Sequence, residues 1–292
     1  MALAREAVAV RTAHAHGLLR GTPGGRTLLR IVGDMVRIQL VDRSLALASL
    51  IFTSMLPVIM AASTFSGWHT ALDAINTKFG VESVTLEPDS TAAQTDSALT
   101  AFGVVGLLMV LISGTAFARG LVRMYTAIWV EVPALGARDA WRWMASLLVI
   151  AVAVALVGQT RYLERLAYAG GPLTLAAEFV LWSATWAWVP QLLTKGALSP
   201  RVLTTTGMLT GAALTAIQTA GRIVLPRTTV SAQQHFGPLG IAFTLVSWLF
   251  VVSIAIVAGA TIVKALALDE TRVGAFLRGP SATGTQIDSR PS

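Results

Sequence analysis

The sequence predicts an all-α polytopic membrane protein, a bundle of six transmembrane helices with both termini in the cytoplasm. Of the 292 residues, 54% are hydrophobic and only 13% are charged, and the mean hydropathy is +0.67. Soluble domains carry about a quarter charged residues. In addition, apolar stretches of membrane length recur along the chain, and Lys and Arg are unevenly divided between the segments that join them. These three observations predict the fold class.

Each predicted span approaches the ~20 apolar residues needed to cross a bilayer. The spans are 45–66, 99–118, 143–160, 173–193, 203–225 and 239–266. The fifth contains TTTGMLTGAALTAIQTAG and is the least apolar. We keep it because the alternative is a long loop without turn signals. The first apolar stretch starts near Leu45, too late for an ordinary signal peptide, so we expect insertion through the helices themselves.

Basic residues set the orientation. They concentrate before the first span, within 119–142 and at the C-terminal end, whereas the predicted outer loop 67–98 is acidic. Both termini are therefore expected in the cytoplasm. The net charge of +7 is explained by this topology and by anionic inner-leaflet lipid, worth about 1 kcal/mol per basic residue near the surface. Membrane lipids are the expected partners, and nucleic acid is not expected to bind. The sequence also allows a homo-oligomer or an envelope-protein partner.

The predicted domain plan has three parts. Residues 1–27 form a basic, flexible cytoplasmic N-terminus, 28–268 form the membrane domain, and 269–292 form a cytoplasmic tail that is disordered from residue 279. The membrane domain opens with an interfacial helix at 28–43, LLRIVGDMVRIQLVDR, in which charged and apolar residues alternate at helical spacing. For this helix, a structural role as an elbow that positions the first span is favoured over a role as a lipid-sensing element.

One carboxylate, Glu178, falls inside the apolar stretch AAEFVLWSATWAWVP at 176–190. The predicted boundaries place it roughly 7–8 Å from the outer end of its helix. Near the outer end of the next span, Gln218 and Arg222 belong to a polar stripe at helical spacing with Thr215. Arg222 is therefore expected at the depth of Glu178, where an ion pair would lower the cost of burying both charges.

Two interpretations of this pair stay open. Glu178, Gln218 and Arg222 are candidates for a substrate or ion pathway, lining a cavity open to the outer leaflet. Alternatively, Glu178 pairs or reaches water for structural reasons and holds two helices together, which the shallow depth slightly favours.

Other polar and special residues have weaker functional signals. Pro57 is a hinge candidate because it removes a hydrogen bond to the carbonyl of Thr53, and Ser54 could satisfy backbone groups that are freed in this way, although static shape is favoured. Gly207 and Gly211 have the GxxxG spacing of close helix packing. The Gly237-Pro-Leu-Gly240 sequence predicts a break before the last span.

The segment FARGLVRMYTAIW at 117–129 continues the second span as a basic helical exit. Within it, Arg119 and Arg123 are four residues apart and are candidates for binding lipid phosphates. Facing water without a partner is an equally weighted alternative.

Three stretches together resemble one family. They are RSLALASLIFTSMLPVIMAAS at 43–63, FARGLVRMYTAIW, and LPRTTVSAQQHFGPLGIAFTLVSWLFVVSIAIVAGA at 225–260. This combination is similar to the YihY/BrkB family of bacterial inner-membrane proteins, over about residues 28–268. The resemblance implies six transmembrane helices, an inner-membrane location and a role in the cell envelope. Export or flipping of a lipid has been proposed for members. The resemblance implies no catalytic motif.

Many members of that family carry the label ribonuclease BN, which the residues do not favour. Metal-dependent hydrolysis needs clustered His and Asp ligands, whereas the four histidines are scattered: His14 and His16 in the basic N-terminus, and His69 and His235 on predicted outer loops. There is no cysteine and no nucleotide-binding or hydrolase motif. The sequence therefore predicts no enzyme, no metal and no cofactor. It favours a transporter or flippase-like protein, with a non-catalytic membrane scaffold or envelope-integrity factor as the alternative.

Overall fold

The computed structural model describes residues 23–66, 96–129, 139–165, 170–269 and 272–278. This part of the chain is helical, in agreement with the predicted class. The elements in chain order are α2 (Pro23–Arg37), α3 (Leu40–Ser66), α5 (Asp96–Ile128), α6 (Ala140–Gln159), the 3₁₀-helix η2 (Thr160–Arg165), α7 (Gly170–Leu193), α8 (Pro200–Phe236), α9 (Pro238–Ala267) and α10 (Arg272–Arg278). The predicted N-terminal region before Pro23, the outer loop and the tail beyond residue 278 lie outside the described residues.

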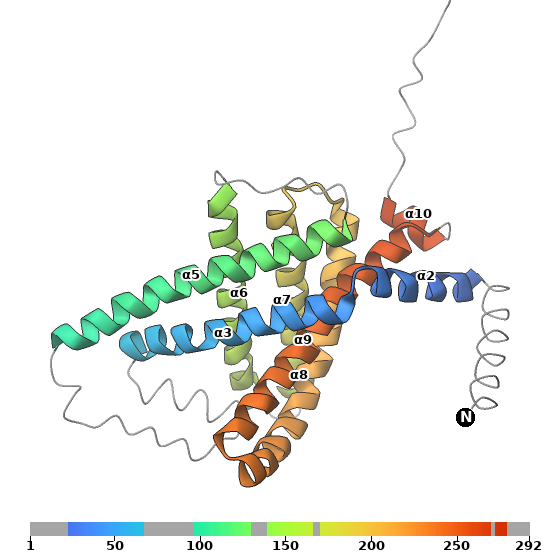
Figure 1. Cartoon of the computed structure of the whole chain (residues 1–292). Coiled ribbons are helices and arrows are strands. Elements are labelled where there is room, and N and C mark those ends of the chain that lie inside the picture. Colours follow the sequence, from blue (N-terminus) through green and yellow to red (C-terminus); the bar gives the residue numbers. More distant parts are fainter. Residues whose placement is uncertain (1–22, 67–95, 130–138, 166–169, 270–271, 279–292) are drawn as a thin grey trace, which may run out of the picture.

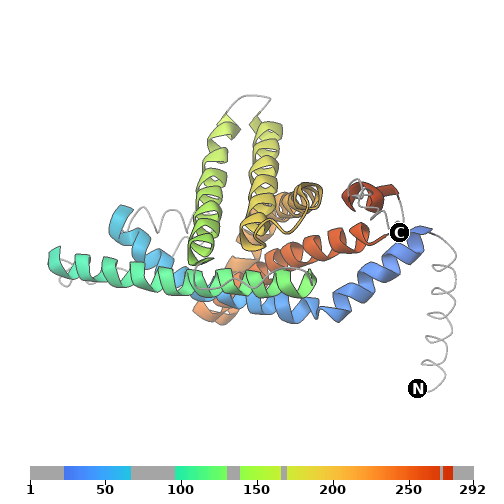
Figure 2. The same cartoon turned by 90° about the horizontal axis from the view of Figure 1, so that it is seen from above.

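The long helices form two groups that cross each other. α3 and α5 lie side by side and run crosswise to α6, α7 and α8 (Figure 1). Figure 2 shows α6 and α7 standing to one side of the α3–α5 pair. α9 contacts α3, α5 and α8, so it connects the two groups. This arrangement is more open than a bundle in which all helices are parallel.

The main hydrophobic core lies where α3, α5, α7 and α9 meet. α5 contributes Tyr125 and Ile128, which are almost fully buried, and α7 contributes Val189. Val257 and Ala260 of α9 are completely buried beside them. Because α9 supplies residues to the centre of this core, it holds the crossing groups together.

Four of the described helices have the length and the hydropathy of membrane spans. Val105–Ile128 of α5, together with α6, α8 and α9, are long and apolar enough to cross a membrane. The Thr- and Gly-rich fifth predicted span is thus confirmed as a membrane-length helix. α7 is not among the four, and its content of Glu178, Trp182, Trp186 and Trp188 lowers its hydropathy. The number of six spans and the orientation stay predictions.

The beginning of the membrane domain differs from the single interfacial helix predicted at 28–43. α2 starts earlier, at Pro23, and ends at Arg37, and α3 starts at Leu40. The break occurs at Gln39, whose φ of 53° lies in the left-handed region, which a continuing α-helix cannot accommodate. The Arg43 side chain donates to the carbonyl of Ile38 (2.6 Å) and so satisfies one of the groups freed at the break.

The break between α8 and α9 agrees with the prediction from Gly-Pro-Leu-Gly. Gly237 has φ 61° and ψ −144°, a combination that glycine adopts without a Cβ penalty. Pro238 then occupies the first position of α9, where its missing N–H costs nothing. Gly240 allows α9 to pack closely against α8 after the turn, because a Cβ at this position would clash with the backbone of Ala232.

Candidate functional site

The candidate site is an ion pair between α7 and α8. The Nη2 of Arg222 donates to Oε1 of Glu178, joining the two charges that the sequence predicts at similar depth. The side chain of Glu178 is only 1% exposed, whereas that of Arg222 is 32% exposed. The carboxylate is thus enclosed by protein, and the guanidinium keeps one side accessible.

A threonine from outside both helices completes the surroundings of the carboxylate. Thr160, the first residue of η2, donates its hydroxyl to Oε1 of Glu178 (3.3 Å) and to the carbonyl of Val157 (2.8 Å). Thr174, one turn before Glu178 on α7, donates to the carbonyl of Thr160 (3.3 Å) and so fixes η2 against α7. We did not predict Thr160, because nothing in the sequence indicates that the end of α6 folds back as a 3₁₀ turn.

The helix boundaries place both residues of the pair farther from the helix ends than the sequence predicts. α7 begins at Gly170, so Glu178 lies roughly 12 Å along the helix from its start at ~1.5 Å per residue. α8 continues to Phe236, so Arg222 lies roughly 21 Å before its end and not near it. The helix α8 continues beyond residue 225, where the predicted span ends, through Pro226 and the polar sequence that follows it.

Close contact between α7 and α8 holds the pair in place. A Cβ at Gly207 or Gly211 would meet Ser183 or Ala187 of α7 at less than van der Waals distance. Small residues on both helices therefore allow the backbones to touch, as the GxxxG spacing predicts. Glu178 lies on the buried face of α7 that also carries Trp182 and Trp186. The carboxylate thus belongs to a helix contact.

The rest of the predicted polar stripe on α8 takes little part in this contact. Thr215 donates to the carbonyl of Gly211 (2.9 Å) and Thr219 to that of Thr215 (2.8 Å), so both hydroxyls are satisfied within α8. Gln218 is half-buried one turn before Arg222, and the described contacts of the Glu178–Arg222 pair do not include it. The structure therefore joins two of the three pathway candidates.

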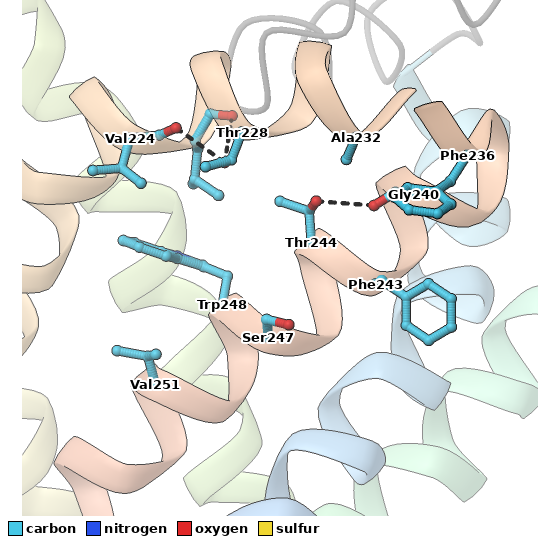
Figure 3. Close-up of a pocket in the computed structure, with 11 residues that line it drawn as sticks. Val224, Thr228, Ala232, Phe236, Gly240, Phe243, Thr244, Ser247, Trp248 and Val251 are labelled. Atoms are coloured by element: carbon cyan, nitrogen blue, oxygen red, sulfur yellow. Dashed lines mark hydrogen bonds between the residues drawn. The ribbon is translucent and has the colours of Figure 1, made fainter. Parts of the chain in front are cut away.

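A separate cleft opens between α8 and α9, beyond the ion pair along the chain. It encloses about 670 Å³. Its walls are mainly apolar, as Figure 3 shows for Val224, Phe236, Phe243, Trp248 and Val251. Glycines shape both of its ends, since a Cβ on Gly221 would meet the ring of Trp248 and one on Gly240 would meet Ala232.

The threonine hydroxyls in the cleft are turned back to their own helices. Thr228 donates to the carbonyls of Val224 (3.0 Å) and Leu225 (3.1 Å), and Thr244 donates to that of Gly240 (2.9 Å). The threonine methyl groups therefore add to the apolar surface. Such a surface suits hydrocarbon and not a polar solute. The sequence does not predict this cleft, because residues 226–238 are expected in an outer loop and only those from 239 onward in the last span.

The lipid-phosphate candidates on α5 differ in their surroundings. The Arg119 side chain bonds the carbonyl of Thr115 (3.3 Å), and its guanidinium lies 5.7 Å from the centre of the Trp143 ring of α6. Arg119 is thus partly occupied by protein contacts. Arg123 is exposed one turn later and is the better placed of the two for an external anion.

The hinge candidate lies in an unbroken helix. α3 continues through Pro57 to Ser66. Ser54 donates to the carbonyl of Ile51 (2.8 Å) and therefore does not satisfy the carbonyl of Thr53. A serine hydroxyl in a helix reaches the carbonyls three or four residues before it, and the carbonyl of Thr53 is only one residue away.

The residues relevant to nuclease chemistry are only partly described. His235 lies in the last turn of α8 and not on a loop, because α8 extends to Phe236, and its Nδ1 lies 2.8 Å from the carbonyl of Ser231. His14, His16 and His69 fall outside the described residues. Within the ranges that the structure covers, no group of three or more His, Asp or Glu side chains is arranged to hold a metal ion.

Comparison of the chain with protein-family models, with curated proteins and with solved structures finds no match.

Proposed function

We propose that this chain is a multi-pass protein of the bacterial inner membrane that moves an amphipathic lipid or similar envelope component between leaflets. The proposal includes six spans with both termini in the cytoplasm, and membership of the YihY/BrkB family on the strength of the motifs at 43–63, 117–129 and 225–260. It involves no catalysis, metal or cofactor. The energy source and direction of movement are not part of it.

The observation that carries the proposal is the cleft between α8 and α9. Both helices are long and apolar enough to cross a membrane. In the proposed arrangement the cleft between them faces the hydrocarbon region and admits an acyl chain from the side. A cleft of about 670 Å³ falls within the ~300–1,000 Å³ of ordinary ligand sites. Arg222 lies shortly before the cleft on α8 with its side chain 32% exposed, and its guanidinium can form charge-assisted hydrogen bonds to an anionic headgroup.

Reconstitution with fluorescent phospholipids tests this function. Dithionite bleaches only the outer leaflet, so the bleached fraction reports movement between leaflets. We expect Thr228→Trp, which fills the cleft, to abolish movement above the empty-vesicle rate. Ala220→Trp is the matched control, because Ala220 is exposed on the same helix but does not line the cleft. Equal activity in both variants would refute the cleft as the lipid path, and inactivity of the unmodified chain with all lipids tested would refute movement itself.

A scaffold is the second candidate, and the burial of Glu178 favours it. At 1% exposure the carboxylate serves the α7–α8 contact, as a structural role requires. In this alternative the chain acts through envelope partners and the cleft holds a static lipid. Expression of Thr228→Trp in cells distinguishes the two functions. A scaffold keeps envelope integrity in this variant, whereas a lipid mover loses it.

A further inference from the structure

α2 differs from the spans in having three distinct faces. Thr27, Ile31, Asp34 and Ile38 follow one another at helical spacing on the side that packs against α9. A second side carries Leu28, Val32 and Val36, which are exposed by 55%, 55% and 73%. The third side carries exposed Arg26, Arg30 and Arg37. At ~100° per residue the apolar side is roughly 140° from the charged side and roughly 130° from the side that packs against α9.

Polar contacts attach α2 to the end of α9. Thr27 donates its hydroxyl to Asp269. Arg30 forms an ion pair with Asp269 (3.5 Å) and donates to the carbonyl of Leu268 (2.9 Å). Lys264, in the last turns of α9, is 7% exposed and lies within electrostatic range of Asp34 and Arg37 of α2. These contacts place α2 beside the point where a membrane-length helix ends.

We infer that the face formed by Leu28, Val32 and Val36 docks on the lipid leaflet in which α9 ends, and that this leaflet is anionic. A helix held at the end of a span lies at the level of the headgroups, where an exposed apolar stripe is buried among the upper acyl chains. Arg37 pairs with Asp34 (3.2 Å), which is the only acid of α2, so Arg26 and Arg30 leave this helix with a net positive charge. That charge attracts phosphate headgroups.

The shape of the elbow supports the same occupant. The apolar side continues past the break at Gln39 to Val41, which is 58% exposed, and Leu45 of α3, 48% exposed. A shallow hollow at the break is mainly apolar and includes two polar residues; it is lined by Val32, Met35, Val36, Gln39, Leu40, Val41 and Asp42. The exposed apolar surface of α2 is thus continuous with that of α3, and a lipid surface that covers one would also cover the other. This site is independent of the lipid movement proposed above.

The absence of cysteine from the chain permits a direct test by single-site labelling. Nitroxide labels at Val32→Cys and Val36→Cys are examined in the full chain, in nanodiscs of phosphatidylcholine alone and with phosphatidylglycerol. Docking predicts high accessibility to oxygen and low accessibility to a water-soluble nickel chelate, more strongly with phosphatidylglycerol. Ala197→Cys, exposed in the turn between α7 and α8, is the control and stays accessible to nickel in both.

A second variant tests the charge. Arg26→Gln, placed in the Val32→Cys background, is expected to lower the ratio of docked to undocked label about fivefold with phosphatidylglycerol, which corresponds to about 1 kcal/mol per basic residue, and to change little in phosphatidylcholine. Nickel accessibility at residues 32 and 36 in both lipids overturns the inference. Spin–spin broadening between labels also overturns it, because a second copy then covers the face. Equal docking in both lipids overturns the requirement for an anionic leaflet.

Discussion

Glu178 and Arg222 form an ion pair in which the two partners differ in burial. The carboxylate is enclosed by α7, α8 and Thr160 at 1% exposure, whereas the guanidinium side chain is 32% exposed. Loss of one partner therefore has different consequences for the two charges. Without Arg222 a buried carboxylate loses its counter-charge, whereas without Glu178 the guanidinium can turn towards water or headgroups.

This asymmetry predicts unequal effects of neutralising each residue. We expect Arg222→Gln to lower the free energy of unfolding by about 3 kcal/mol, the lower end of the range for a broken buried pair. Glu178→Gln should cost only about 1.5 kcal/mol, the lower end of the contribution of hydrogen bonds to charged groups. Denaturant titration in detergent micelles measures both. The double variant should be more stable than Arg222→Gln alone, and equal losses in the two single variants would contradict the described burial.

Two glycine substitutions, one in the α7–α8 contact and one in α6, should change the free energy of unfolding in opposite directions. A Cβ at Gly211 would lie 2.7 Å from the backbone nitrogen of Ser183, so Gly211→Ala should separate the helices and cost about 1–3 kcal/mol. At Gly158 of α6, nothing lies within 4 Å of the same atom. Gly158→Ala should therefore stabilise by about 0.5–1 kcal/mol through helix propensity. Thermal unfolding of the two variants compares them, and stabilisation by Gly211→Ala would show that the helices are not in contact.

The turn between α8 and α9 predicts a conformational cost at Gly237. Its φ of 61° with ψ −144° is a region that residues with a Cβ avoid, so Gly237→Ala should destabilise by about 1–3 kcal/mol. Because no atom lies within 4 Å of a Cβ there, the cost is one of backbone strain alone. Gly33→Ala, also without neighbours but inside α2, serves as the control and should be neutral or stabilising. A neutral Gly237→Ala would mean that the turn adopts another conformation.

Ser199 links the start of α8 to α10 and predicts a moderate capping effect. Its hydroxyl accepts from the N–H of Val202 (3.4 Å) and donates to the carbonyl of Leu277 in α10 (3.3 Å). Ser199→Ala should cost about 1 kcal/mol, as for other N-caps. It should also speed amide hydrogen exchange in α10 relative to α2. Unchanged exchange in α10 would show that Arg201, which donates to the carbonyl of Phe276 (3.0 Å), holds α10 without it.

The helix α8 illustrates which features sequence patterns can predict. Its apolar and small residues at 203–225 predict a span, and Gly207 with Gly211 predicts close packing, because both features depend on neighbours along one helix. Its true end at Phe236 was missed, since the sequence after Arg222 contains Pro226 and several polar residues that are typical of a loop. Contact with α9 keeps this part helical, and the cleft exists only because α8 continues alongside α9.

The sequence by itself determined the helical class, the membrane-length apolar segments and the break at Gly237, because composition, hydrophobic length and backbone freedom are local properties. It also placed Glu178 and Arg222 on successive helices. Only the tertiary structure decided that Thr160 reaches the carboxylate, that α2 attaches to the end of α9, and that a cleft separates α8 from α9. Each of these depends on how helices distant in sequence are rotated and packed, and many rotations are compatible with the same pattern of apolar residues.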